Sequence, residues 1–303
     1  MGAPKRQVAT SLSELIVVPD YQRADELVRS GVDSSRLVIA RSDDEANAIE
    51  HAESGLAHER GPLPLRPHDS GYRCLVLLPT YNEADNVEIM VRDIRAYLDT
   101  DVLVIDDNSP DGTGEIADRL AAEDDRVKVL HREGKQGLGT AYLAGFDYAI
   151  EHDYQRVFEM DADFSHPPWD LPRLVEATRD AKLAIGSRYV PGGSTIGWDL
   201  KRRLLSRGAN FYARTILGMR VKDVTAGYRC FDVDALRNLD LSSVHAEGYA
   251  FQVEMAYRMI RAGHRIAEIP IHFTDRRLGA SKMDGRIARE AIWLVPKLRF
   301  RVR

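Results

Sequence analysis

The sequence predicts an α/β fold, in which helices flank a doubly wound, mostly parallel sheet. From residue 73 onward, short apolar runs alternate with stretches of helical periodicity, and the connections between them are short. Such alternation is typical of βαβ units, whose strands are buried on both faces. Unusual polar residues also follow the ends of several apolar runs, where sheets of this kind bind ligands.

Four strands and three helices follow one another in this region. The first strand, 72–79, is the continuous apolar run "YRCLVLLP". The first helix begins near Asp85, which has capping-box spacing to Glu88. One stripe of that helix is apolar: Val87, Met90, Val91, Ile94 and Leu98. The other expected elements are strands at 101–107, 126–132 and 154–163 and helices at 112–124 and 139–152.

The first 70 residues differ from the rest of the chain. Apolar runs at 14–19 and 36–40 indicate short strands, and an amphipathic stretch follows each of them. Prolines make 55–71 a stiff linker. We therefore expect an accessory α/β segment with its linker at 1–70, the main α/β domain at 71–290 and a separate tail at 291–303.

The charge, cysteine and apolar content of the chain argue against a nucleic-acid-binding protein and against a membrane-spanning one. The 303 residues carry a net charge of −5, whereas a nucleic-acid-binding domain is usually strongly basic, so no nucleic-acid partner is expected. Cys74 and Cys230 lack metal-ligand spacing, which favours buried free thiols and a reducing cytosol. No apolar run is long enough to span a bilayer, and the N-terminus lacks a signal peptide. We expect a cytoplasmic protein, soluble or peripheral on a membrane.

The C-terminal end is strongly basic. Between Arg276 and Arg303, nine basic residues face only Asp284 and Glu290. The last stretch, "AIWLVPKLRFRVR", mixes Trp, Leu and Phe with arginines, a composition typical of amphipathic helical segments at membrane interfaces. A solvated tail is the alternative.

The strongest functional signal is "FEMDADFSHPP" at 158–168, where Asp161 and Asp163 end the fourth apolar run. Residues two apart in an extended segment point the same way. At about 5 Å and an effective dielectric near 20, two carboxylates repel by roughly 3 kcal/mol. Mg²⁺ or Mn²⁺, which prefer carboxylate oxygens, would offset that repulsion.

Neighbouring loops make this signal more specific. "PTYNE" at 79–83 and "DDNSPDGT" at 106–113 place more acids at the same expected sheet edge. Acids and a metal suit a nucleotide diphosphate-sugar, because the metal neutralises charge on the departing diphosphate. A dehydrogenase is disfavoured, since "GKQGLGTAY" has Tyr142 where the last glycine of its fingerprint belongs. Phosphate-loop and hydrolase-elbow motifs are absent as well.

Together, "PTYNEADNV", "VIDDNSPDGT", "GKQGLGTAY", "DADFSHPP", "GSRY", "GWDLKRRLLSRGANFYAR", "DVTAGYRCF" and "RRLGASK" resemble the family-2 glycosyltransferases of the Rossmann-like GT-A fold. Within that family they are most similar to polyprenol- or dolichol-phosphate mannose synthases. The resemblance covers about 73–290 and identifies 71–290 as a GT-A catalytic domain. It implies inverting transfer of mannose from GDP-mannose to a polyprenyl (dolichyl-type) phosphate, giving polyprenyl-phosphate mannose and GDP, with Mg²⁺ or Mn²⁺ as cofactor.

The same resemblance implies a peripheral protein on the cytoplasmic face of a membrane, in contact with anionic lipids. A membrane-protein partner or an oligomer is compatible with this location.

Two alternative functions stay open. The same fold could use UDP-glucose or another nucleotide-sugar with polyprenyl phosphate. A protein of another class, a non-catalytic membrane-surface scaffold, could keep the fold, but it would have little reason to keep the paired Asp161 and Asp163.

The resemblance assigns the nucleotide-sugar side of the site. Its residues are Pro79, Tyr81, Glu83, Asp106, Asp107, Lys135, Asp161, Arg277 and Lys282. Tyr81 can stack or donate its hydroxyl, and Glu83 can accept from ribose hydroxyls or a guanine amino group. One of Asp106 and Asp107 contacts the base. Arg277 and Lys282 belong to a loop that closes over the donor diphosphate.

The metal and the acceptor complete the expected site. Asp161, Asp163 and Ser165 are the metal ligands; the family often has Gln where this chain has Ser165. Arg188, Arg202 and Ser206 match the acceptor-phosphate group, and Arg202 and Ser206 are spaced i, i+4 on one helix. Asp161, Asp163, Arg188 and Arg202 form the catalytic set. A phosphate monoester is mostly a dianion at neutral pH, so no general base is expected.

Overall fold

The computed structural model describes residues 16–18, 37–39, 64, 66–244, 246, 248–274 and 295–302. The chain forms two compact units, 1–68 and 69–303. In the first unit the described elements are two short parallel strands, β1 (Ile16–Val18) and β2 (Leu37–Ile39). They fall within the two apolar runs that indicate strands there, and the helices expected beside them lie outside the described residues.

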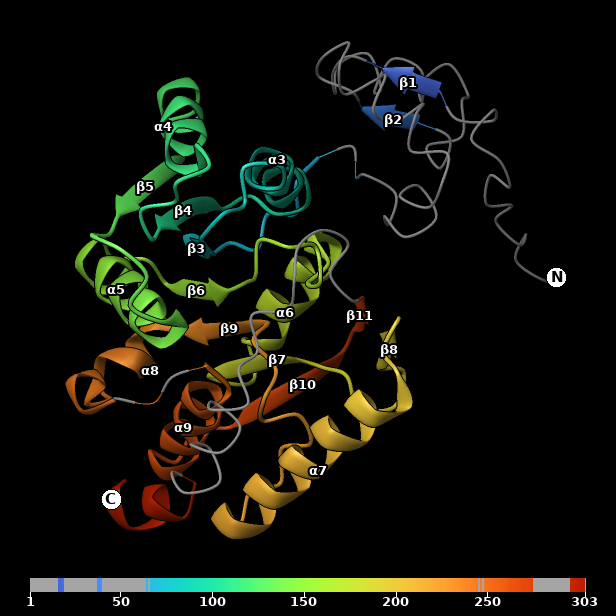
Figure 1. Ribbon diagram of the computed structural model, residues 1–303, viewed down its shortest axis with the longest axis vertical. Coiled ribbons are helices and arrows are strands. Elements are labelled where there is room, and N and C mark those ends of the chain that lie inside the picture. The colour runs from blue at the N-terminus through green and yellow to red at the C-terminus, as the bar shows by residue number, and fades with distance from the viewer. Residues whose placement is uncertain are drawn as a thin grey trace, which may run out of the picture. The chain divides into compact units, whose positions relative to one another are not determined.

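A seven-stranded sheet organises the second unit, with the order β10-β7-β9-β6-β3-β4-β5 (Figure 1). Its strands are β3 (Cys74–Thr80), β4 (Asp101–Asp106), β5 (Val127–His131), β6 (Arg156–Glu159), β7 (Leu183–Ser187), β9 (Arg229–Asp232) and β10 (Ile266–Pro270). Every neighbouring pair is parallel except those of β9, which is antiparallel to β6 and β7. The predicted mostly parallel α/β sheet is confirmed. A small parallel pair joins β8 (Ser194–Ile196) to β11 (His272–Thr274).

Helices contribute to two apolar clusters, one on each face of the sheet (Figure 1). One cluster includes α3 (Val87–Tyr97), α4 (Thr113–Glu123) and α6 (Leu171–Ala177). The other includes α5 (Leu138–Glu151), α7 (Leu200–Leu217), α8 (Val233–Arg237) and α9 (Gly248–Arg261). A 3₁₀ turn at Pro168–Asp170 precedes α6, and another at Leu241–Ser243 precedes α9.

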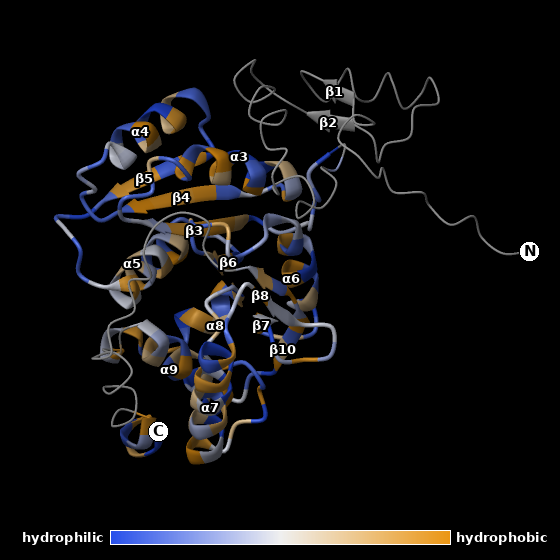
Figure 2. Cartoon of the chain, turned by 45° about the vertical axis from the view of Figure 1, so that its right-hand side comes forward, coloured by the Kyte–Doolittle hydropathy of each residue, from blue (hydrophilic) through white to orange (hydrophobic). Residues whose placement is uncertain are grey.

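Strand β3 shows why its sequence is apolar throughout. Leu75 and Leu77 pack into the cluster of α5, whereas Cys74, Val76 and Leu78 pack into the cluster of α3. Successive side chains point to opposite faces, so a strand covered on both faces loses its polar alternation. Figure 2 shows the same apolar colour along β3 and β4 between their helices. Both cysteines are free and buried, as expected.

The start of α3 differs from the expectation. Its N-cap is Asn86, which makes no side-chain capping bond, so the predicted capping box of Asp85 and Glu88 is wrong. The backbone carbonyl of Glu83 accepts from the N–H groups of Asn86 and Val87 instead, each at 2.9 Å. The turn of the preceding loop therefore satisfies the first donors of the helix.

The C-terminal residues 295–301 are helical. Val295, Leu298 and Val302 are buried in the cluster of α5 and α7, whereas Phe300 is 81% exposed. Arg299 Nη1 donates to the carbonyl of Ile216 at 2.8 Å, which ties this segment to the end of α7. Trp293 lies outside the described residues. Among the helices that the structure describes, none is long and apolar enough to cross a membrane.

Candidate active site

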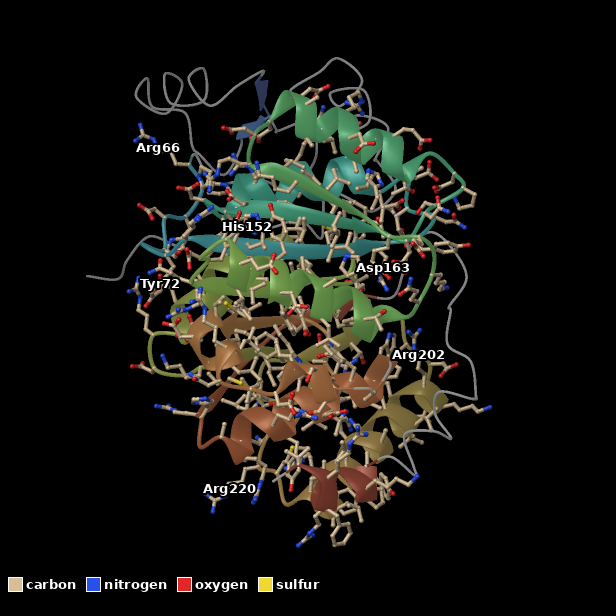
Figure 3. The ribbon with its side chains drawn as sticks, turned by 90° about the vertical axis from the view of Figure 1, so that its left-hand side faces the viewer. Arg66, Tyr72, His152, Asp163, Arg202 and Arg220 are labelled. Atoms are coloured by element: carbon tan, nitrogen blue, oxygen red, sulfur yellow. The ribbon has the colours of Figure 1, made fainter. Side chains whose placement is uncertain are left out.

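A cavity of about 420 Å³ lies at the carboxyl ends of β3, β4, β6 and β7. The expected site residues that line it are Pro79, Tyr81, Glu83, Asp107, Lys135, Asp161, Asp163, Ser165, Arg188 and Arg202. Asp106 and Ser206 are not among its lining residues, and Arg277 and Lys282 lie outside the described residues. Figure 3 shows Asp163 and Arg202 toward one edge of the sheet, and Tyr72, which precedes β3, toward the other.

The two aspartates lie in a loop, not in a strand. Strand β6 ends at Glu159, so the expected alternation of Asp161 and Asp163 along an extended chain is wrong, although both reach the cavity. The backbone N–H of Asp161 donates to His166 Nδ1 at 3.0 Å. Phe164 then takes a left-handed conformation, with φ of 61°. These local bonds turn the chain out of the sheet and hold both carboxylates at the cavity.

Asp163 and Ser165 are bound to each other. One carboxylate oxygen of Asp163 accepts from the backbone N–H of Ser165 at 3.1 Å and from its hydroxyl at 2.6 Å. Asp163 is buried, whereas the side chain of Asp161 is 30% exposed. Asp161 therefore presents its oxygens most openly to the cavity, and Ser165 orients Asp163.

The carboxylates at this site fit a divalent cation that takes its ligands partly from the protein and partly from the substrate. No group of three or more His, Cys, Asp or Glu side chains within the described part of the chain could enclose a metal. Mg²⁺ commonly binds through only one or two carboxylates, with waters and substrate phosphates completing the shell. Asp161 and Asp163 can supply those two carboxylates, while the ring of His166 is stacked on Tyr228 and its Nδ1 is engaged by the loop.

A buried ion pair forms the base of this loop. Glu159, the last residue of β6, pairs in the sheet with Arg229 of β9, and their charged groups are 4.0 Å apart with no exposed surface. Burial raises the pKa of Glu159 to about 7 although Arg229 lowers it, and burial lowers the pKa of Arg229 to about 10. Arg229 also donates to the carbonyls of Val224, Ala226 and Gln252. No role was expected for Glu159 or Arg229 from the sequence; each is a charged residue at the end of a short buried strand.

The nucleotide side distinguishes the two adjacent aspartates. Asp106 is buried and accepts from Thr80 Oγ1 at 3.2 Å and from Ser109 Oγ at 2.5 Å, so it holds the loop together. Asp107 lines the cavity and pairs with Arg132 at 2.8 Å. Burial raises the pKa of Asp107, and Arg132 opposes that shift. The geometry thus favours Asp107 over Asp106 for ligand contact.

Lys135 and Tyr81 both line the cavity and contact each other. Lys135 Nζ lies 4.8 Å from the centroid of the Tyr81 ring, within the range of a cation–π contact. Each comes from a loop that follows a strand, β3 for Tyr81 and β5 for Lys135. An aromatic face and a cation here suit a nucleoside and its phosphates.

Arg188 is locked in place. Its guanidinium donates to both oxygens of Asp223, at 2.7 Å each, and to Thr225 Oγ1 at 2.9 Å. Burial alone would lower the pKa of Arg188, but the charge and hydrogen bonds of Asp223 outweigh it and raise the pKa. Asp223 lies 35 residues away in sequence, and no motif indicated it as a partner.

The other two residues expected to bind the acceptor phosphate, Arg202 and Ser206, differ in position: Arg202 lines the cavity and Ser206 does not. Arg202 lines the cavity near the start of α7, with its guanidinium carbon 4.3 Å from the Trp198 ring centroid. Ser206 Oγ instead accepts from the hydroxyl of Tyr189 at 2.6 Å. The structure therefore brings Arg188 and Arg202 to one cavity and places the Ser206 hydroxyl at Tyr189. Thr225 also lines the cavity; it lies in the quoted motif "DVTAGYRCF", but no role was expected for it. Gln252 and Phe273, two more lining residues, lie outside the quoted motifs.

Gly193 allows the loop after Arg188 to fold back on itself. A Cβ at this position would lie 2.5 Å from the carbonyl oxygen of Ser187 and 3.0 Å from that of Arg188. We expect Gly193→Ala to lower the free energy of unfolding by about 1–3 kcal/mol, measured by denaturant titration, because the backbone must shift. Gly208→Ala is the matched control: nothing lies within 4 Å of its Cβ, and alanine should stabilise the helix by about 0.5–1 kcal/mol. Equal stability of the two variants would contradict the steric argument.

Two proteins of known function are similar in sequence to most of this chain. Undecaprenyl-phosphate mannosyltransferase from Micrococcus luteus is 50% identical over 221 residues, which cover 73% of this chain and 91% of that protein. Polyprenol monophosphomannose synthase from Mycolicibacterium smegmatis is 48% identical over 237 residues, covering 77% of this chain and 88% of that protein.

A solved structure shows the fold at lower identity. Glucosyl-3-phosphoglycerate synthase from Mycobacterium tuberculosis, in complex with Mn²⁺, UDP-glucose and glycerol 3-phosphate, is 20% identical with a TM-score of 0.57. The likeness covers 76% of this chain and 81% of that one. Residues 75–240, more than half of the chain, match the family described as Glycosyl transferase family 2. With this match, the relatives at 48–50% identity and the shared fold, the chain belongs to glycosyl transferase family 2.

Proposed function

We propose that this protein transfers mannose from GDP-mannose to a polyprenyl phosphate with inversion, releasing GDP. The observation that supports it best is one cavity lined both by the carboxylates of Asp161 and Asp163 and by the cations of Arg188 and Arg202. The first pair suits a metal-bound donor diphosphate, and the second suits an acceptor phosphate. The names of the two relatives, which refer to undecaprenyl phosphate and polyprenol phosphate with mannose, supply the substrate class.

In this proposal the protein's main task is alignment. An oxygen of the lipid phosphate bonds to the anomeric carbon of mannose as the bond from that carbon to the diphosphate breaks. The lipid phosphate is already mostly a dianion at neutral pH, so no side chain has to remove a proton. Arg202 orients the acceptor, Asp107 and Tyr81 orient the nucleoside, and Asp161 and Asp163 hold Mg²⁺ or Mn²⁺. When bound, that cation neutralises charge on the departing diphosphate.

Two parts of the proposal extend beyond the described residues or the cavity. Arg277 and Lys282, in "RRLGASK", would add positive charge over the donor diphosphate. We also place the protein on the cytoplasmic face of a membrane, because its proposed acceptor is a lipid. A membrane-protein partner or an oligomer would be compatible with that location.

Metal removal tests donor, acceptor and cofactor together. Purified protein is incubated with radiolabelled GDP-mannose and a short-chain polyprenyl phosphate in detergent. Label should enter the lipid extract, fall to background with EDTA and return with added Mn²⁺ or Mg²⁺, because the diphosphate leaves poorly without a cation. The matched reaction uses labelled UDP-glucose. Equal or greater label from UDP-glucose would reject GDP-mannose as the donor, and full activity in EDTA would reject the metal.

A further inference from the structure

Helix α7 carries a row of exposed apolar side chains. Leu200, Leu204 and Phe211 are 71%, 61% and 70% exposed, and their spacing of four and seven residues puts them on one side of the helix. Phe300, at 81% exposure, lies in the C-terminal helical segment tied to the end of α7 by Arg299. Scattered apolar residues are normal on a surface, but a row of large ones marks a membrane or protein contact.

The charges of α7 indicate which of these contacts applies. Within Leu200–Leu217 there is no Asp or Glu, while the basic residues are Lys201, Arg202, Arg203, Arg207 and Arg214. This concentration contrasts with the net charge of −5 for the whole chain. An apolar row flanked by basic residues is the pattern of a helix that lies in the interface of a bilayer with anionic lipids.

A second cavity, of about 540 Å³, lies between α7 and the 188–193 loop. Its charged lining residues are Arg188, Arg207, Arg214 and Lys222, with no carboxylate among the lining residues that the structure describes. Arg188 is paired with Asp223 and also lines the first cavity, so Arg207, Arg214 and Lys222 are the cations that line this second cavity alone. Nε of Arg214 is buried and has no hydrogen-bond partner within the described part of the chain. A buried donor of this kind needs an acceptor, which a phosphate oxygen can supply.

We propose that α7 is the surface by which this protein lies on a bilayer and that the cavity between α7 and the 188–193 loop takes the phosphate of an anionic lipid. The apolar row enters the boundary of the acyl chains, and Arg207, Arg214 and Lys222 bind the headgroup beside it. This lipid site is separate from the cavity that holds Asp161 and Asp163, although Arg188 borders both. The choice of a lipid as occupant rests on the proposed function, whose acceptor is a membrane lipid.

Vesicle co-sedimentation tests the two parts of the surface separately. Wild type should bind vesicles of phosphatidylcholine with phosphatidylglycerol more tightly than phosphatidylcholine alone. Arg207→Gln with Arg214→Gln should weaken binding to the anionic vesicles roughly 30-fold, as two lost charges of about 1 kcal/mol each imply, and change binding to neutral vesicles little. Leu204→Ser with Phe211→Ser should weaken binding to both.

The matched control removes two exposed arginines at the other edge of the sheet, Arg261→Gln with Arg265→Gln. Anionic-vesicle binding of the Arg207/Arg214 variant equal to that of this control would overturn the proposal. Inorganic phosphate that binds wild type but not the Arg207/Arg214 variant, with equal vesicle binding by the two proteins, would overturn the lipid assignment in favour of a free anion. Thermal unfolding of each variant checks that it is folded.

A separate assay distinguishes this proposal from the proposed function. Mannose transfer to a short-chain acceptor in detergent should be unchanged in the Arg207/Arg214 variant, whereas transfer to an acceptor embedded in anionic vesicles should fall with binding. Wild type that binds the vesicles as expected but transfers no mannose would overturn the proposed function and leave the docking surface standing. Loss of transfer in detergent by the folded variant would place these arginines in the reaction and overturn a docking role.

Discussion

Asp161→Asn is expected to lower kcat/KM for mannose transfer by about 100- to 1000-fold while leaving the fold intact. The substitution removes the charge of the more open of the two cavity carboxylates, and that charge holds the cation on the donor diphosphate in the proposed mechanism. The side chain is 30% exposed, so an amide of the same size should be tolerated. Initial rates across a Mn²⁺ titration should also show a weaker apparent affinity for the metal.

Two further variants make the result specific. Asp180→Asn, an exposed carboxylate outside the cavity, should retain wild-type rates. Asp163→Asn should lose activity and some stability together, because Asp163 also accepts both bonds from Ser165. An Asp161→Asn variant with near-normal rates and metal dependence would show that the cation is held elsewhere.

Sequence could predict those features of the fold and site that depend on neighbouring residues along the chain. The strands could be predicted because burial on both faces leaves an uninterrupted apolar run, as at β4 (Asp101–Asp106). The acids at the strand ends could be named, but the path of the "DADFSH" loop could not. Its turn depends on His166 accepting from the backbone of Asp161 and on a left-handed Phe164, neither of which has a periodic signal.

Side-chain partners from distant segments were the harder part. The i, i+4 spacing of Arg202 and Ser206 suggested one shared phosphate, yet the hydroxyl of Tyr189 binds Ser206 from another loop. Sequence also left Asp106 and Asp107 equivalent, and the structure separates them, because Thr80 and Ser109 bind Asp106 whereas Asp107 lines the cavity. Spacing along one helix shows which side chains are neighbours, but it does not show which side chain from another segment binds them.

The Arg188–Asp223 pair gives the largest expected effect on stability. Asp223→Ala should lower the free energy of unfolding by about 3–5 kcal/mol, because it leaves a buried guanidinium without its counter-charge. The side chains of Arg188 and Asp223 are 4% and 0% exposed, and Asp223 also accepts from the backbone N–H of Arg188 at 2.9 Å. Denaturant titration measures the change. Glu123→Ala, which breaks the exposed pair of Glu123 with Arg119, is the control and should cost less than about 1 kcal/mol.

A double variant separates the structural role of this pair from its catalytic role. Arg188→Met with Asp223→Leu replaces both charges with apolar side chains, and such replacements are often neutral for stability. We expect it to recover much of the loss seen in Asp223→Ala, short of the bond to the Arg188 backbone. If the refolded double variant still fails to transfer mannose, the charge of Arg188 acts on the acceptor phosphate; if it transfers at wild-type rates, Arg188 only supports the loop. A loss below 1 kcal/mol in Asp223→Ala would mean that the ion pair does not hold this loop in place.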